Sequence, residues 1–551
     1  MNNALHANTL RRYWDTVRHL RVRQVFGRVW HQLRRHRPDG GPAPDLRARD
    51  HTWEPPARRE PSLLGPTTFL FLGEKGSLEE VQWNGPQKSL LWRYNQHYFD
   101  DLNSRDALSR SSSHRNMLLA WVESNPPGMG IGWAPYPTSV RIVNWIKWVL
   151  GGETLPDPCL HSLAIQTRWL SKHLETHLLG NHLFANAKAL VFAGLFFSGQ
   201  EAEGWLDTGL RVLAEEVPEQ ILADGAHFER STMYHALAVE DMLDLCNVAA
   251  CYRLSVQGDR RSQAQDWARR APAMMTWLNS MCHPDGEIAF FNDAAIGMAP
   301  APDELNAYAQ RLGLGSPDLA FPGSLWMHAS GYARLVSSSA VALVDLAPIG
   351  PDYLPGHAHA DTLSFELSVH GERFLVNSGT SSYQDVAARR QQRATAAHNT
   401  VEVEGKDSSE VWGSFRVGRR ARIRHAEVIL TGAMSSARGI HDGYRHLETA
   451  HERTISLNEN CCTVEDLLDN KHVSGVARFH FAPDVRITPL ADGAGGTAML
   501  PNGRVIRWEI AIGEAWIEPA TWHPRFGVSV ANMCLCVRLD EGRAKSHWNW
   551  N

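Results

Sequence analysis

The sequence predicts a multidomain α+β protein in which a helical domain precedes an antiparallel β-sandwich. Three observations lead to this prediction. At 551 residues the chain is too long for one hydrophobic core. Apolar residues recur at helical spacing from about residue 90 to 315, and short alternating runs separated by turn residues follow from about residue 325. In such an architecture, a cleft between the domains is the expected place for a ligand.

The composition is that of an ordinary globular protein, with 43% hydrophobic and 21% charged residues. A formal net charge of −5 gives no general case for binding nucleic acid. The eight cysteines form no CxxC pair, which indicates buried thiols in a reducing compartment. The sequence shows neither a secretory signal nor an apolar run of about 20 residues. We therefore expect a cytoplasmic protein, and a periplasmic one if the start codon is misplaced downstream of a signal.

Residues 1–66 are expected to form a basic N-terminal helix and a linker. Nine arginines lie between residues 11 and 37, with apolar residues interleaved at helical spacing. Such a helix either packs on the body of the protein or makes peripheral contact with an anionic membrane, and the first arrangement is the commoner. Residues 38–66, rich in Pro, Gly, Arg and Asp, are typical of a linker.

Residues 67–320 are assigned to the helical domain. Leu170, Leu174 and Leu178 form one apolar stripe that Gly180 is expected to end, and a second stripe starts at Leu183. This pattern predicts helix hairpins that follow one another. Tryptophans also recur through the region. A single tryptophan is more often part of a core, but a cluster at a cleft suits stacking against sugar rings.

Residues 321–551 are assigned to the β-sandwich. The run from Thr362 to Val369 alternates between apolar and polar residues, which predicts a strand with one buried and one exposed face. Turn residues such as His370-Gly371 separate the runs, as in an antiparallel sandwich. The other expected strands are 340–346, 374–376, 400–404, 421–430, 462–467, 505–512 and 528–539.

Four residues from distant parts of the sequence form a candidate acid–base set. A β-elimination next to a carboxylate needs a group that neutralises the carboxylate, a base for the α-proton and an acid for the leaving oxygen. Asn181 can donate an amide hydrogen to the carboxylate. His182 or His357 can accept the proton near neutral pH. Tyr234 can protonate the leaving oxygen and, with a lowered pKa, can also act as the base.

Each of these residues also has a structural interpretation. Asn181 and His182, after a glycine that ends a helix, are more often a cap and a hydrogen-bonded core histidine. Tyr234 at the start of an apolar helix is more often a core tyrosine. His357 and His359, two residues apart, point the same way, so a functional and a structural role are about equally supported.

Five ordered segments carry a resemblance to a known family. They are Trp133-Ala-Pro-Tyr-Pro-Thr-Ser-Val-Arg-Ile-Val-Asn-Trp145, Gly180-Asn-His-Leu-Phe-Ala-Asn186, Glu229-Arg-Ser-Thr-Met-Tyr-His235, His357-Ala-His-Ala-Asp361 and Ala397-His-Asn-Thr-Val401. Over nearly its whole length the chain resembles the heparinase II/III family of polysaccharide lyases. The run 16–30 is similar to the start of members found beside bacterial surface-polysaccharide genes.

The resemblance implies an incomplete α/α toroid followed by an antiparallel β-sandwich. It also implies β-elimination at a uronic acid of an anionic, glycosaminoglycan-like polysaccharide, which leaves a 4,5-unsaturated uronate end. By position, Asn181 matches the residue that neutralises the carboxylate, and His182 matches an adjacent site histidine. Tyr234 matches the acid and a candidate base, and His357 matches the second candidate base.

The resemblance also concerns a metal site. Members with a metal bind it through two histidines and an aspartate of the β domain. His359 and His398 match the histidines, whereas Asn377 stands where the acid is expected. An amide binds Zn²⁺ more weakly than a carboxylate, so the resemblance does not decide whether this chain binds the metal. We expect that the reaction requires no cofactor, and two alternatives remain open for these residues. The three residues either hold a structural Zn²⁺ or form a hydrogen-bonded cluster.

Two arginines are candidates for binding the substrate. Arg393 offers a planar guanidinium group to a carboxylate or sulfate, and Arg141 is a second candidate. For Arg141, an ion pair inside the helical domain is the commoner role.

Two rival functions remain open at the level of the sequence. A uronosyl C5-epimerase on the same scaffold would remove the same proton and return one to the other face of the sugar. A non-catalytic glycan-binding protein of polysaccharide assembly would not require Asn181, Tyr234 and His357 together. The uronate polymer itself is not specified, because selectivity lies in loop contacts.

Overall fold

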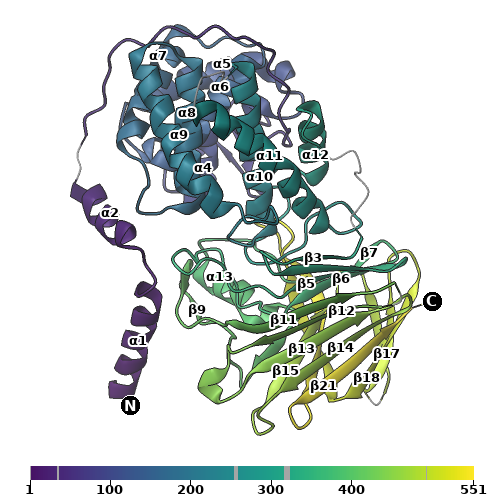
Figure 1. Cartoon of the computed structure of the whole chain (residues 1–551). Helices are drawn as coiled ribbons and strands as arrows, with labels where there is room; N and C mark the ends of the chain where they lie inside the picture. Colours follow the sequence, from purple (N-terminus) through teal and green to yellow (C-terminus); the bar gives the residue numbers. More distant parts are fainter. Residues whose placement is uncertain are drawn as a thin grey trace.

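The computed structural model describes residues 2–33, 36–253, 259–315, 323–432, 434–491 and 493–550. In Figure 1 a helical body lies above an antiparallel β body, with the N-terminal helices along one side. The boundary predicted between residues 320 and 321 lies outside the described residues, as do Arg34 and Arg35 of the predicted basic helix.

The helical body surrounds one apolar helix. α8 (Gly180–Phe196) packs against α6 (Pro135–Leu150), α9 (Gln200–Gln220) and α10 (Thr232–Cys251), and it is apolar on nearly all sides, as a surrounded helix must be. The other α-helices and strands of this body are β1 (Thr68–Phe71), β2 (Glu74–Ser77), α3 (Leu78–Val81), α4 (Leu90–Tyr98), α5 (Ser111–Ser124), α7 (Asp157–Lys172), α11 (Asp259–Ser280) and α12 (Pro302–Arg311).

The prediction that Gly180 ends a helix is wrong. α7 already ends at Lys172, and Gly180 is the first residue of α8. The leucines at 174 and 178 lie in the loop between these helices, where Leu178 contributes to the lining of a cavity. Apolar residues at helical spacing therefore continue here past the end of the helix.

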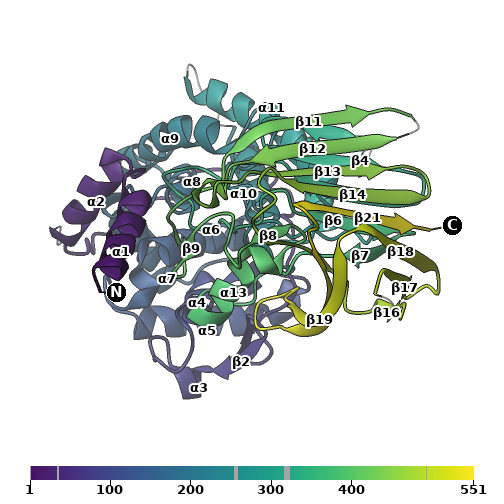
Figure 2. The ribbon, with the colours of Figure 1, turned by 90° about the horizontal axis from the view of Figure 1, so that it is seen from below.

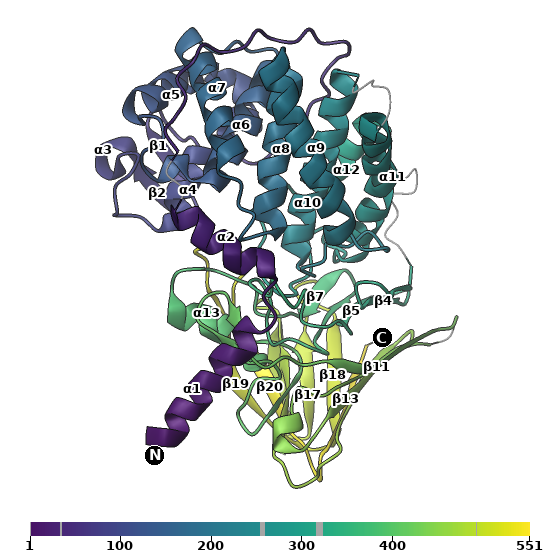
Figure 3. The same cartoon turned by 60° about the vertical axis from the view of Figure 1, so that its left-hand side comes forward.

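The predicted basic N-terminal helix is in fact two helices, α1 (Asn2–Val17) and α2 (Val22–Leu33). α1 packs on the β body, where the Tyr13 ring meets Trp412 edge-on at 5.0 Å. α2 packs on the helical body, where Arg21 Nη2 lies 2.5 Å from Glu219 Oε1. The two helices therefore connect the bodies on the side of the molecule opposite the C-terminus (Figures 2 and 3).

This packing is the commoner of the two arrangements expected for a basic amphipathic segment. Trp14 and Phe26 nevertheless remain 63% and 71% exposed on the outer side of the helices. Peripheral membrane contact through this surface stays a prediction. Within the described part of the chain, no helix is both long and apolar enough to cross a bilayer.

The β body contains three larger sheets and a short hairpin, and the named strands pair antiparallel throughout. The five-stranded sheet has the order β3 (Leu325–Met327), β4 (Tyr332–Val336), β5 (Ala340–Asp345), β6 (Phe365–Val369), β7 (Glu372–Leu375). The eight-stranded sheet has the order β11 (Ile423–Leu430), β12 (Ser435–His441), β13 (His451–Leu457), β14 (Cys461–Leu468), β21 (Arg543–Asn549), β18 (Val505–Ile512), β17 (Gly495–Met499), β16 (Arg486–Pro489). The four-stranded sheet has the order β19 (Glu514–Trp522), β20 (Val530–Arg538), β15 (Gly475–His480), β8 (Val401–Val403). β9 (Val411–Trp412) pairs with β10 (Arg416–Val417), and α13 (Val386–Arg393) lies beside them.

The five-stranded sheet lies between the two bodies. One face packs Tyr332 and Leu343 against Trp277 of α11, and the other packs Phe365 and Leu367 into the core of the larger sheets. The prediction that β6 has an exposed polar face is therefore wrong, because the helical body covers that face. The sheet joins the two bodies through buried side chains on both sides.

Candidate active site

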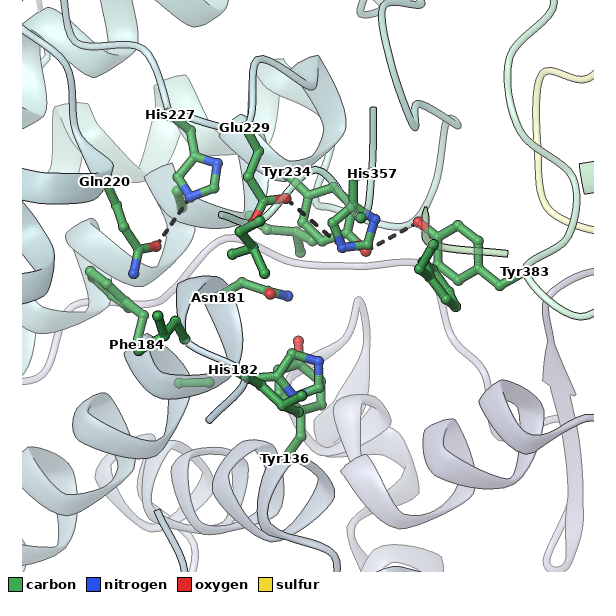
Figure 4. A pocket seen from close by; sticks show the side chains of 18 of the residues that line it. Tyr136, Asn181, His182, Phe184, Gln220, His227, Glu229, Tyr234, His357 and Tyr383 are labelled. Atoms are coloured by element: carbon green, nitrogen blue, oxygen red, sulfur yellow. Dashed lines mark hydrogen bonds and ion pairs between the residues drawn. The ribbon is translucent and has the colours of Figure 1, made fainter. Parts of the chain in front are cut away.

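A cavity of about 810 Å³ lies where the helical body, the β body and the N-terminal helices meet. Its walls include the first turns of α8 and α10, the loop before β6, the hairpin of β9 and β10, and residues of α1 and α2. The structure brings the four predicted catalytic residues together in this lining: Asn181, His182, Tyr234 and His357. Their mutual placement is shown in Figure 4.

Asn181 offers a free amide to the cavity. It occupies the first turn of α8, directly after Gly180, whose φ is +56°. This φ favours glycine, and a Cβ at Gly180 would also approach the end of the Leu354 side chain to 2.4 Å. Figure 4 shows the amide directed into the open centre, and no described residue bonds to it. The amide is therefore available for a ligand.

His182 is held by a buried acid. Its Nδ1 lies 3.1 Å from Glu175 Oε1, and its ring packs on Tyr136 at 4.6 Å. Asn186 fixes Glu175 in turn, since its amide donates to Glu175 Oε2 at 3.1 Å. Burial lowers the pKa of His182, but the charge and hydrogen bond of Glu175 raise it by more, so the net shift is upward. The arrangement favours a cationic imidazole beside the Asn181 amide.

Tyr234 pairs with a second tyrosine. Ser231 caps α10 by accepting the Tyr234 backbone N–H at 3.1 Å, which places Tyr234 in the first turn. The Tyr234 hydroxyl lies 3.1 Å from the hydroxyl of Tyr383. Burial, followed by the Tyr383 and Asp293 side chains, raises the pKa of Tyr234 well above 10. The phenol therefore stays protonated and suits the role of a proton donor.

His357 has a defined tautomer. Its Nδ1 lies 2.8 Å from Asp293 Oδ2, and Arg389 pairs with both oxygens of that carboxylate. Burial raises the pKa of Asp293, but Arg389 and the two bonded histidines lower it by more, so the carboxylate is ionised and can only accept. The Nδ1 of His357 consequently carries the hydrogen. The Nε2 of neutral His357 has the lone pair, and the ring lies 3.9 Å from the ring of Tyr234.

Glu229 is a site residue that sequence reasoning did not assign. Its Oε2 lies 3.8 Å from His357 Nε2, and neither carboxylate oxygen has a hydrogen-bond partner among the described residues. Burial raises the pKa of Glu229. Asp293 and Tyr383 were also missed, because neither belongs to a recognisable motif. Only Glu229 lay inside a segment that carried the family resemblance.

The structure does not place either of the two predicted substrate-binding arginines in the lining of the cavity. Both guanidinium groups are fully buried, and neither residue lines the cavity. Arg393 donates to the backbone carbonyls of Ala358 at 2.9 Å and Ser414 at 3.2 Å, so it fixes the loop that carries His357. Arg141 lies 3.9 Å over the Trp121 ring inside the helical body. Both arginines support the fold around the site.

The predicted metal set is also changed. His359 Nδ1 lies 3.1 Å from His398 Nε2, and a carboxylate oxygen of Asp361 lies within 4.8 Å of both. Asn377 takes no part, because its side chain binds backbone groups such as the Phe290 carbonyl at 3.0 Å. The acid near the histidines is Asp361. Two imidazoles and a carboxylate are a donor set that Zn²⁺ accepts, so these residues fit the ion.

Family models match both parts of the chain. The model described as heparinase II/III N-terminus matches residues 111–311, and the model described as heparinase II/III-like, C-terminal matches residues 322–550. The chain belongs to the heparinase II/III family. Membership agrees with the resemblance carried by the five sequence segments.

Three curated relatives show how far the similarity extends. Heparin-sulfate lyases of Bacteroides stercoris and Pedobacter heparinus are each 25% identical, over 41% and 52% of this chain. These matches span 36% and 47% of the relatives, so the chain covers less than half of their length. FtsZ-localized protein C of Caulobacter vibrioides is also 25% identical, over 86% of this chain and 83% of its own length.

Solved structures confirm the predicted fold class. A crystal structure of heparinase III aligns with a TM-score of 0.66 at 19% identity, over 86% of this chain and 80% of that one. A mutant of the heparan sulfate lyase HepC from Pedobacter heparinus aligns with a TM-score of 0.61 at 19% identity, over 84% of this chain and 77% of that one. The fold of this family member is an incomplete α/α toroid followed by an antiparallel β-sandwich.

Proposed function

We propose that the protein is a polysaccharide lyase that cleaves a uronate-containing, glycosaminoglycan-like glycan by β-elimination. The observation that carries this proposal is the convergence in one cavity of an amide, a phenol and an imidazole with a free Nε2 lone pair. They come from Asn181, Tyr234 and His357, which lie far apart in the sequence. Family membership and the names of the heparin-sulfate lyase relatives support the proposal.

Asn181 and His182 would bind the carboxylate of the uronic acid. As the proton leaves C5, negative charge spreads into this carboxylate, and the neutral amide and the cationic imidazole stabilise the charge where it develops. Glu175 keeps His182 oriented and favours its protonated form. Asn181 and His182 would thus make the C5 proton more acidic.

His357 and Tyr234 would then carry out the proton transfers. The Nε2 of His357 takes the C5 proton, a double bond forms between C4 and C5, and the bond from C4 to the glycosidic oxygen breaks. Tyr234 donates its hydroxyl proton to that oxygen, and the raised pKa of Tyr234 favours this acid role over a base role. One product ends in a 4,5-unsaturated uronate.

A structural Zn²⁺ held by His359, His398 and Asp361 would stiffen the loop that carries His357. The reaction as proposed needs no chemistry from that ion. Asp293 connects the proposed base with the proposed metal site, because its carboxylate binds His357 and also lies 2.8 Å from His359 Nε2.

The decisive variant is Tyr234→Phe. It should still bind the glycan but lose about 10²–10⁴-fold in kcat, because only the transferred proton is removed. Turnover is followed by the ultraviolet absorbance of the conjugated unsaturated uronate. Tyr252→Phe, which removes a buried hydroxyl outside the cavity lining, is the matched control. An unchanged kcat in Tyr234→Phe, or no absorbance on any uronate polymer, would contradict the proposal.

A second candidate is glycan binding without turnover. The relative with 86% coverage, FtsZ-localized protein C, has a name that states no enzymatic activity. Binding of a uronate polymer with neither absorbance nor exchange of the C5 proton with deuterated solvent would favour this role. Exchange without absorbance would instead indicate an epimerase, since an epimerase returns a proton to C5.

A further inference from the structure

The cavity extends into the helical body beyond the reactive residues, along α8 and α10. These helices pack side by side, and each carries a proposed reactive residue, Asn181 or Tyr234, in its first turn. Seven residues further, Lys188 and Asp241 line the same cavity and pair at 2.7 Å. Positions seven apart share a helix face and are separated by about 10 Å along the axis. This ion pair therefore borders the space next to the reaction centre.

Acids cover the positive charges of this wall. The Lys188 amine also lies 2.7 Å from Asp244, and the Lys147 amine lies 3.0 Å from the same carboxylate. The side chains of Lys188 and Lys147 are only 6% and 3% exposed, whereas that of Asp241 is 29% exposed. The part of the network that a ligand meets is thus a carboxylate.

The rest of the lining shows the same balance. The whole lining, including the residues just described, contains six Asp or Glu side chains and five Lys or Arg side chains. The guanidinium group of Arg59 donates hydrogen bonds to both carboxylate oxygens of Glu240, at 2.7 and 2.6 Å. Arg28 and Arg416 are exposed residues of the lining and have no carboxylate partner among the described residues. Unpaired positive charge is therefore found at the rim and not along the inner wall.

We infer that the cavity takes a uronate glycan whose sugar beside the scissile bond carries no sulfate. The inference rests on the proposed function and narrows its substrate class. A sulfate on that sugar would need a free cation, and it would instead face the partly exposed carboxylate of Asp241, whose like charge repels it. Sugar hydroxyls and an N-acetyl amide can donate hydrogen bonds to the same carboxylate. Arg28 and Arg416 attract the uronate carboxylates of the polymer at the rim.

The test compares polymers that share a backbone and differ in sulfation. One pair is N-acetylheparosan and heparan sulfate, and the other is desulfated chondroitin and chondroitin sulfate. The value of kcat/KM should be at least tenfold higher for the unsulfated member of each pair. Asp241→Asn should narrow this ratio at least threefold, because it removes the partly exposed carboxylate charge and leaves Lys188 paired with Asp244. Glu465→Gln on the exposed side of β14 changes the net charge equally and should leave the ratio unchanged.

Two results would overturn the inference. A kcat/KM on the sulfated members equal to or above that on the unsulfated members would do so while leaving the proposed lyase function intact. If no polymer is turned over, the proposed function fails. The inference about sulfation is then tested by the binding of labelled oligosaccharides from the same pairs. At least tenfold tighter binding of the unsulfated oligosaccharide supports the inference, and equal or tighter binding of the sulfated one refutes it.

Discussion

At the scale of single residues, the charge of His182 depends on Glu175, 3.1 Å away. Glu175→Gln removes the negative charge that raises the His182 pKa, so the imidazole should lose its proton at a lower pH. In the proposed reaction the cationic form holds the uronate carboxylate, so kcat/KM should fall as the pH rises through this pKa. The descending limb of the pH profile of kcat/KM should therefore move to lower pH in the variant.

A matched control for this experiment is Glu201→Gln, which removes a surface partner of Arg168 outside the cavity lining. Its pH profile should superimpose on that of the parent protein. A descending limb that stays in place in Glu175→Gln would show that His182 does not act as a cation in the reaction.

The same scale shows what short motifs can and cannot predict. Asn181, Tyr234 and His357 could be proposed from the sequence, because their functional groups match the requirements of one reaction and lie in segments that resemble a family. Asp293 and Glu229 could not be assigned roles. Their importance arises from burial and from contacts with residues distant in the sequence, such as the pairing of Asp293 with Arg389.

At the scale of elements, α2 forms one wall of the cavity and depends on a close approach at Gly27. A Cβ there would lie 2.9 Å from the Cβ of His177 and 3.2 Å from its Cα. Gly27→Val should displace α2, which carries Gln24 and Arg28 of the lining. We expect KM to rise several-fold and kcat to change less than about twofold, since the reactive residues lie on other elements.

Gly40→Val is the matched control, because a Cβ at Gly40 meets nothing within 4 Å. Steady-state kinetics on one uronate polymer measure both variants. A KM in Gly27→Val equal to that of the control would show that α2 contributes nothing to substrate binding.

Periodicity predicted whether a segment is a helix or a strand better than it predicted which faces of the element are buried. The run 505–512 was predicted with the bounds that β18 has in the structure. In β6 the alternation was read correctly as a strand, yet all five of its residues are buried. Alternation identifies the apolar face of a strand, but it does not show whether another domain covers the polar face.

At the scale of the whole molecule, the cavity exists only because three parts of the chain meet. Contacts such as the 2.7 Å ion pair between Arg12 of α1 and Glu410 beside β9 hold the N-terminal helices in place. Such long-range pairs leave no periodic signal, so the sequence predicted a helical and a β domain but not the third wall. The same limit applies to the polar contacts that join the two bodies.

Glu366 of β6 is the centre of those polar contacts. Its fully buried carboxylate accepts hydrogen bonds from the backbone N–H groups of Phe290 at 3.0 Å and Asn377 at 2.6 Å. It also lies 2.8 Å from Nε2 of His283, which follows α11. Burial raises the pKa of Glu366 to about 7, although Arg373 and the two backbone bonds oppose the shift. The junction of the two bodies therefore contains a group that titrates near neutrality.

This shift makes the stability of the protein depend on pH in a defined direction. In the unfolded chain the pKa of Glu366 is about 4.5, so between that pH and about 7 only the folded state holds the proton. The contribution of Glu366 to the free energy of unfolding must then decrease as the pH rises through this window, by roughly 3 kcal/mol in total. Glu366→Gln cannot titrate and should lack this decrease. Denaturant unfolding of both proteins at roughly pH 5 and pH 7.5 measures the difference. If the difference in free energy of unfolding between the two proteins is the same at both pH values, Glu366 is already ionised throughout the window.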